Sequence, residues 1–150
     1  VTFYTLRLTL CDESIQLRIG IEIMKMHILI VDDDKNFIDT LEDGLRLKNP
    51  DVEITMAKSA HEAIEALAAS VPSLIILDVQ LPDMHGVEFM RSLKDTERLK
   101  AVPVIFISAK YTEPADRSEA MLAGGGSFFS KPVEIDELWT EIKYLLDKEK

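Results

Sequence analysis

Cysteine is almost absent from this sequence of 150 residues, since Cys11 is the only one. A single thiol cannot form a disulfide within the chain, so no disulfide framework is expected to hold the fold together. Apolar runs are short as well, and none approaches the roughly 20 residues of a membrane-spanning helix. A signal-peptide pattern is also lacking, and we therefore expect a cytoplasmic protein without a membrane partner.

Basic residues are the second shortage, because 17 Lys and Arg face 27 Asp and Glu and leave a net charge of −10. Proteins bind nucleic acid largely by neutralising phosphates with Lys and Arg, so direct nucleic-acid binding is not expected. An acidic chain instead suits divalent cations or basic protein partners. The length indicates one domain that is large enough to bury its own core.

The first 25 residues differ in pattern from the rest. Apolar and polar residues alternate there with a period of two on both sides of residues 12–14, which predicts a β-hairpin. Two interpretations stay open: an added ribbon that would pack on this domain or on a second copy of it, or sequence upstream of a start at Met24 or Met26. We favour the ribbon and assign residues 26–150 to the main domain.

From Met26 onward, short unbroken apolar runs alternate with segments whose apolar residues follow helical spacing. The unbroken runs predict strands that are buried on both faces. The expected strands are 27–31, 52–57, 74–77, 104–107 and 128–129. The expected helices are 35–48, one capped by Ser59, one after Gly86, one begun by Thr112 and Pro114, and a last one with the apolar stripe 135–146. Five such units predict a doubly wound parallel α/β sheet with helices on both faces.

Polar residues follow the ends of four of these strands: Asp32 and Asp33, Asp78, Ser108, and Lys131. The carboxyl ends of parallel strands lie at one edge of the sheet, where ligands bind in open α/β folds. Three carboxylates gathered there would repel one another without a cation between them, and an oxygen-only ligand set suits Mg²⁺ better than zinc or copper. A phosphoryl group on Asp78 would then lie between the metal, the Ser108 hydroxyl and the Lys131 ammonium.

Four motifs in this order resemble the receiver domain of bacterial two-component response regulators, including the chemotaxis regulators. They are Ile-Leu-Ile-Val-Asp-Asp-Asp at 28–34, Leu-Asp-Val-Gln-Leu-Pro-Asp-Met-His-Gly at 77–86, Ile-Ser-Ala at 107–109 and Lys-Pro at 131–132. Each motif alone is weak, but four at strand ends are specific. The resemblance covers residues 26 to about 146 and implies a flavodoxin-like sheet of order 2-1-3-4-5.

The resemblance also implies a phosphoacceptor and a metal site. Asp78 would take a phosphoryl group from a phosphohistidine of a histidine kinase or phosphotransfer protein. Asp33 would bind Mg²⁺ directly and Asp32 mostly through water, with Asp78 and the backbone carbonyl of Gln80 as further ligands. The protein would then be a signalling switch in a phosphorelay, without turnover of a substrate beyond its own phosphorylation and dephosphorylation.

The remaining roles follow from the same resemblance. Ser108, Ala109 and Lys131 would bind the phosphoryl group, with a cis bond between Lys131 and Pro132. Ser108 and Phe128 would be the switch pair, and their movement would reshape a face made by the fourth helix, the last strand and the last helix for a downstream protein partner. A homodimer is a further expectation. With no room for an output domain after residue 150, we expect either a stand-alone regulator or a fragment of a longer one.

Two other functions stay open at this point. A Mg²⁺-dependent phosphohydrolase of the haloacid dehalogenase type would use Asp32 as nucleophile and Asp34 as acid/base, although that family has Thr or Val where this sequence has Asn36. An interaction scaffold that is never phosphorylated is the second alternative, and the complete set of site residues weakens it.

Overall fold

The computed structural model describes residues 25–109 and 114–148, so the hairpin expected in residues 1–25 lies, except for Lys25, outside the described residues. The five strands are β2 (His27–Val31), β3 (Glu53–Ala57), β4 (Leu74–Asp78), β5 (Val104–Ser108) and β6 (Ser127–Ser130). The helices are α2 (Lys35–Lys48), α3 (Ala60–Ala69), α4 (Gly86–Lys94), α5 (Pro114–Leu122) and α6 (Ile135–Lys148). Strands and helices alternate along the chain, as the sequence predicts.

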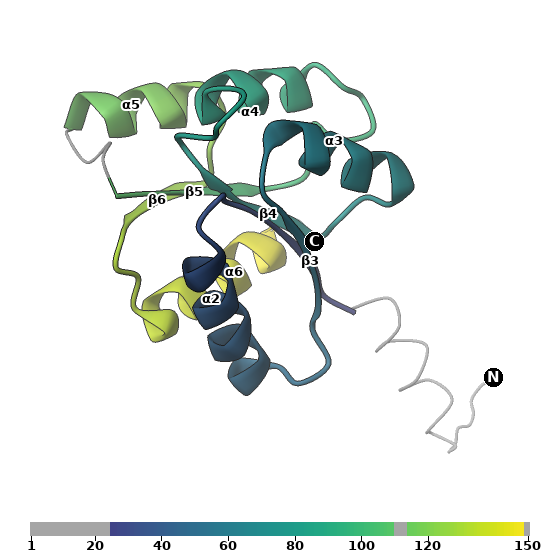
Figure 1. Ribbon diagram of the computed structural model, residues 1–150, viewed down its shortest axis with the longest axis vertical. Helices are drawn as coiled ribbons and strands as arrows, with labels where there is room; N and C mark the ends of the chain where they lie inside the picture. The colour runs from purple at the N-terminus through teal and green to yellow at the C-terminus, as the bar shows by residue number, and fades with distance from the viewer. Residues whose placement is uncertain (1–24, 110–113, 149–150) are drawn as a thin grey trace.

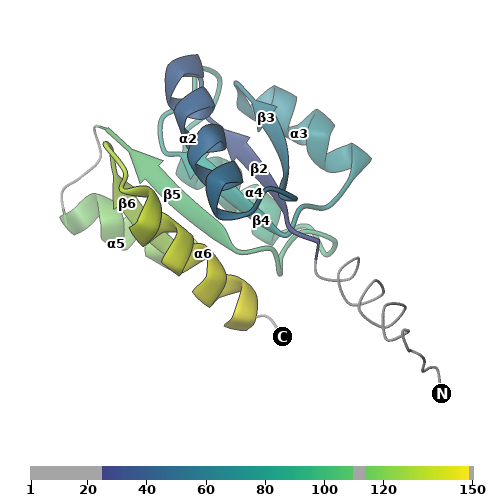
Figure 2. The same cartoon turned by 90° about the horizontal axis from the view of Figure 1, so that it is seen from below.

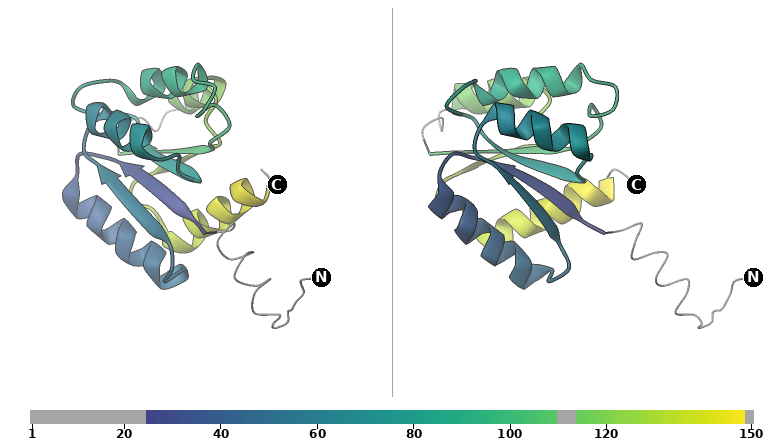
Figure 3. Two further views of the ribbon diagram at one scale, coloured as in Figure 1. Left: turned by 90° about the vertical axis from the view of Figure 1, so that its right-hand side faces the viewer. Right: turned by 45° about the vertical axis from the view of Figure 1, so that its right-hand side comes forward.

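The strands form one parallel sheet in the order β3-β2-β4-β5-β6, which is the predicted order 2-1-3-4-5. Helices α3, α4 and α5 cover one face, and α2 and α6 cover the other (Figure 1, Figure 2). The chain leaves β2 toward β3 on one side and returns to β4 on the other (Figure 3). Crevices form at such a reversal, beyond the carboxyl ends of the strands.

Burial explains the unbroken apolar runs of the central strands. Every residue of β4 and β5 is buried, because helices cover both faces of the sheet. The predicted strand ends differ slightly from those observed: Asp78 and Ser108 are the last residues of their strands rather than the first residues after them. Sheet pairing therefore holds the backbone that carries their side chains, with Asp78 opposite Ile107 and Ser108 opposite Ser130.

Side-chain caps determine where the helices on either side of the site begin. The Asp34 carboxylate accepts a hydrogen bond from the Phe37 N–H and caps α2, and the Ser59 hydroxyl caps α3 by accepting from Glu62 N–H. The latter confirms the predicted cap. Among the described residues, no helix is long and apolar enough to cross a membrane.

Candidate functional site

Asp78 ends the central strand β4 and lines a cleft of about 500 Å³ at the carboxyl edge of the sheet. It is 8% exposed, so its carboxylate reaches the cleft from an otherwise buried position. The other lining residues come from the loops that follow β2, β4, β5 and β6 and from the end of β5: Asp33, Asp34, Gln80, Leu81, Pro82, Ser108, Ala109 and Lys131. The structure therefore brings four of the five residues predicted at separate strand ends into one cavity, namely Asp33, Asp78, Ser108 and Lys131. Asp32 is buried beside the cavity and does not line it.

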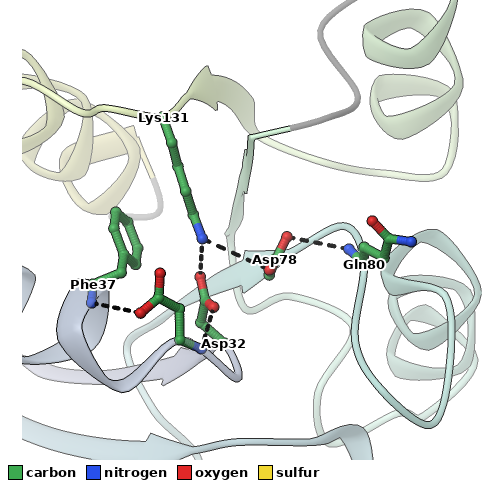
Figure 4. A network of polar contacts seen from close by, with 6 residues as sticks. Asp32, Phe37, Asp78, Gln80 and Lys131 are labelled. Carbon is green, nitrogen blue, oxygen red and sulfur yellow. Dashed lines mark hydrogen bonds and ion pairs between the residues drawn. The ribbon is translucent and has the colours of Figure 1, made fainter.

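Three carboxylates gather beside this cleft, since Asp32, Asp33 and Asp78 each offer an oxygen within 4.8 Å of the others. Lys131 provides the opposite charge (Figure 4), with its Nζ 2.7 Å from Asp32 Oδ2 and 3.8 Å from Asp78 Oδ2. The first approach is an ion pair outside hydrogen-bonding geometry, so among the described residues the buried Asp32 Oδ2 has no hydrogen-bond donor. That oxygen can still accept a further ligand.

The acidic surroundings alter the protonation of Asp78. Burial of the carboxyl, followed by the nearby Asp32 carboxylate, raises the pKa of Asp78 from 3.8 to about 6. The Gln80 N–H, 3.2 Å from Asp78 Oδ1, and the Lys131 ammonium act in the opposite direction. Asp78 is consequently a carboxylate at neutral pH, but one whose charge is less favourable than in water until a cation binds nearby.

Ser108 and Lys131 are joined through the backbone as well as by the cleft. The Lys131 N–H donates to the Ser108 carbonyl at 2.9 Å, which holds the segment after β6 against the end of β5. Ser108 is 1% exposed, and the peptide bond between Lys131 and Pro132 is cis, as expected. Ala109 is exposed at the rim.

The loop after β4 is tied to its neighbours at both ends. The Asp83 carboxylate accepts hydrogen bonds of 2.9 Å from the N–H groups of Ala60 and His61 at the start of α3, which lowers the pKa of Asp83. His85 caps α4 by accepting from the Val87 N–H. Gly86 has no room for a side chain, since a Cβ there would lie 2.5 Å from the Asp78 carbonyl oxygen.

Phe128 on β6 lies between α5 and the core. Its ring is half-buried against the α3–α4–α5 side of the sheet, with its centroid 6.4 Å from that of Phe106. The Arg117 guanidinium of α5 lies 4.9 Å from the Phe128 ring centroid and donates to the Phe128 carbonyl and to the Ser130 hydroxyl. One exposed arginine thus contacts this aromatic residue through both ring and backbone.

Three residues beside the site had no special part in the sequence prediction: Phe37, Asp83 and Arg117. Phe37 lies there only within the expected helix 35–48, yet its ring centroid lies 4.2 Å from Lys131 Nζ. Asp83 appears there only within the motif at 77–86, although Asp side chains in turns commonly accept hydrogen bonds from nearby backbone N–H groups. Nothing in the sequence alone indicates that Arg117 reaches β6, because that contact depends on how α5 lies on the sheet.

The geometry does not favour the phosphohydrolase alternative. Its acid/base would be Asp34, but the Asp34 carboxylate is engaged at the start of α2 by the Phe37 N–H. Its nucleophile would be Asp32, whose Oδ1 accepts from the Asp34 N–H and whose Oδ2 faces Lys131. Asp78, by contrast, lines the cleft itself, and its Oδ2 lies 3.8 Å from Lys131 Nζ.

Comparison with known proteins gives one consistent family. The family model described as response regulator receiver domain matches residues 28–143. Response regulator Rre1 of Synechocystis is 30% identical over 122 residues, which cover 81% of this chain and 52% of that protein. An uncharacterized 14.6 kDa protein of Leptolyngbya boryana is 32% identical over 76% of this chain and 85% of its own length. The chain spans about half the length of Rre1 and of several other curated relatives that it matches.

Solved structures agree with this result. A CheY-like response regulator receiver domain protein from Methanospirillum hungatei has a TM-score of 0.75 at 26% identity, covering 83% of this chain and 96% of that chain. The signal receiver domain of a signal transduction histidine kinase from Syntrophus aciditrophicus has a TM-score of 0.73 at 29% identity, covering 82% and 91%. Receiver domains are signalling domains that bind Mg²⁺ at an acidic pocket, and the three clustered carboxylates match that description. This chain belongs to the response regulator receiver domains of two-component systems.

Proposed function

We propose that Asp78 is the phosphoacceptor of this receiver domain. The observation that carries the proposal is its position: a buried carboxylate at the end of the central strand, open to the cleft and 3.8 Å from the Lys131 ammonium. Its Oδ1 already accepts the Gln80 N–H, which helps to orient the carboxyl plane. A reacting phosphoryl group would fit in the cleft beyond it.

The reaction is a transfer between two covalent carriers. A carboxylate oxygen of Asp78 attacks the phosphorus of a phosphohistidine on a histidine kinase or phosphotransfer protein, and the new O–P bond replaces the N–P bond. The electron pair of the broken bond stays on the imidazole nitrogen of the partner, and Asp78 becomes an acyl phosphate. Lys131, the Ser108 hydroxyl and the Ala109 N–H would bind the phosphoryl oxygens, because all three residues line the same cleft.

Mg²⁺ fits the residues of this site. The carboxylates of Asp32, Asp33 and Asp78 form an oxygen-only set, and Asp32 Oδ2 is a buried oxygen without a hydrogen-bond donor among the described residues. These three residues and the backbone carbonyl of Gln80 would hold the ion. When bound, it supplies positive charge that offsets the charge of the phosphoryl oxygens.

The output of phosphorylation would be a change in the shape of one face of the domain. Movement of Ser108 toward the phosphoryl group would let Phe128 repack, and Phe128 lies under α5 in contact with Arg117. The face formed by α5, β6 and α6 would then bind a downstream protein, or a second copy of the chain. Neither nucleic acid nor a membrane is a proposed partner of this domain, and its proposed location is the cytoplasm.

Acetyl phosphate tests the central step without a kinase. The full chain incubated with acetyl phosphate and Mg²⁺ should gain the mass of one phosphoryl group, and hydroxylamine should remove it, as expected of an acyl phosphate. Asp78→Asn should remain unmodified. Absence of the modification from the wild-type chain, or its persistence in Asp78→Asn, would overturn the proposal.

A further inference from the structure

The ammonium of Lys131 has a third neighbour besides its two carboxylates. The ring of Phe37, in the first turn of α2, lies on another side of the lysine (Figure 4), with its centroid 4.2 Å from Nζ. A cation within about 6 Å of a ring centroid is attracted by the electron-rich face of the ring. The Lys131 side chain is 15% exposed, so this attraction acts where little water competes with it.

The ring and the carboxylate that hold Lys131 come from one short segment. Asp32 Oδ1 accepts from the Asp34 N–H, and the Asp34 carboxylate in turn accepts from the Phe37 N–H. This chain of hydrogen bonds fixes the first turn of α2 relative to Asp32. The two partners of Lys131 therefore belong to one hydrogen-bonded segment, with the ammonium 2.7 Å from Asp32 Oδ2 and 4.2 Å from the centroid of the Phe37 ring.

An aromatic partner differs chemically from the carboxylates around it. The ring attracts the ammonium but cannot bind Mg²⁺ as an oxygen ligand does, and it carries no net charge that would repel a phosphoryl group. Lys131 can thus turn from Asp32 toward a phosphoryl group on Asp78 without leaving the ring. An aliphatic side chain would leave the long lysine freer to extend into solvent, away from the reacting oxygen.

We infer that Phe37 is a positioning residue for phosphorylation, which acts by holding the Lys131 ammonium over its ring beside Asp78. The inference rests on the proposed phosphoacceptor function and deepens it. The electrostatic part of its effect should follow the electron density of the ring rather than the size of the side chain. Phe37 occupies a half-buried position in the apolar cluster on the α2–α6 side of the sheet, so both contributions must be separated by experiment.

A fluorinated series at position 37 makes that separation. Fluorine withdraws electron density from the ring face and changes its shape little, so the rate of phosphorylation by acetyl phosphate with Mg²⁺ should fall stepwise from Phe to pentafluoro-Phe. We expect a total loss of about three- to tenfold, with Phe37→Leu at least as slow and Phe37→Trp close to wild type. The same series at Phe129 is the matched control, because Phe129 belongs to the same cluster and no cation among the described residues lies over its ring.

A second measurement does not depend on phosphorylation. In the protein without Mg²⁺, the Lys131 ε-CH₂ protons should show an upfield ring-current shift in the NMR spectrum, and Phe37→Leu should abolish it. Equal phosphorylation rates across the Phe37 series would overturn the inference, and so would a fall in the Phe129 series as large as that in the Phe37 series. In either case, phosphorylation of the wild-type chain would still support the phosphoacceptor function. A missing ring-current shift would also overturn it, and a wild-type chain that takes up no phosphoryl group would overturn both.

Discussion

Lys131 Nζ lies 2.7 Å from Asp32 Oδ2 but 3.8 Å from Asp78 Oδ2, so the ammonium is paired with a neighbour of the proposed acceptor rather than with the acceptor itself. Both members of the close pair are largely buried, at 15% and 2% side-chain exposure. The arrangement offsets part of the negative charge of the cluster while it leaves the cleft side of Asp78 open. A small movement of the Lys131 side chain would bring its ammonium to a phosphoryl group there.

Removal of the lysine charge should therefore destabilise the protein. Lys131→Met leaves the buried Asp32 carboxylate uncompensated, and we expect a loss of about 3 kcal/mol in the free energy of unfolding at neutral pH without Mg²⁺. Urea denaturation measures this change. The double variant Lys131→Met, Asp32→Asn should recover most of the loss, and a double variant as unstable as the single one would contradict the pairing.

The stability of the protein without metal should depend on the protonation of Asp78. The pKa of Asp78 is about 6 in the folded protein and 3.8 in the unfolded chain. Between these pH values the folded state therefore binds more protons than the unfolded state. The contribution of Asp78 to the free energy of unfolding is therefore greatest at low pH and is lost as the pH rises through about 6. Asp78→Asn should raise the melting temperature more at about pH 8 than at about pH 5.

Added Mg²⁺ gives the complementary result. Because a cation favours the charged carboxylate, its stabilising effect on the wild-type protein should be larger at about pH 8 than at about pH 5. Thermal unfolding with and without Mg²⁺ at both pH values checks this. An Asp78→Asn effect that is independent of pH would contradict the raised pKa.

Gly86 should tolerate no side chain, because the added Cβ would meet backbone atoms behind Asp78. We expect Gly86→Ala to destabilise the fold by about 2–3 kcal/mol and to slow phosphorylation, since β4 or the start of α4 must shift. Gly44→Ala is the matched control: it lies inside α2, and its Cβ would meet only the movable Ile135 side chain. Denaturation and phosphorylation assays that show equal effects for both variants would contradict the expectation.

Arg117 should restrain Phe128 in the unphosphorylated protein. Arg117→Lys keeps the charge but loses the planar group that contacts ring, carbonyl and hydroxyl together, and we expect faster exchange of the Phe128 ring between orientations. Fluorine NMR with a labelled Phe128 measures that exchange. Arg91→Lys on α4, whose guanidinium is 4.0 Å from Glu119, serves as the control and should leave the ring unaffected.

The parallel sheet with helices on both faces could be predicted from the sequence because the pattern is strong there, whereas its strand order 2-1-3-4-5 came from the resemblance to receiver domains. Strands buried on both faces leave unbroken apolar runs, and right-handed βα connections allow few topologies. The edge where Asp32, Asp78, Ser108 and Lys131 gather follows from parallel strands alone. The predicted strand ends at residues 77 and 107 were one residue short, since the backbone of a polar residue can pair in a sheet as well as that of an apolar one.

Contacts between elements were harder to predict. Phe37 lies inside the predicted helix 35–48, and nothing in the helical spacing shows that its ring meets Lys131, which follows β6. Nothing in the sequence pattern shows that His85 Nδ1 caps α4. Such details depend on the angle at which a helix approaches the sheet, which local sequence does not determine.

The most direct measurement identifies the modified residue itself. After treatment of the full chain with acetyl phosphate and Mg²⁺, borohydride reduction converts a phosphorylated aspartate to homoserine, which peptide mass spectrometry can place in the sequence. Homoserine at position 78 alone is the expected result. Homoserine at Asp32 or Asp33 instead, or at no position, would contradict the assignment of Asp78 as phosphoacceptor.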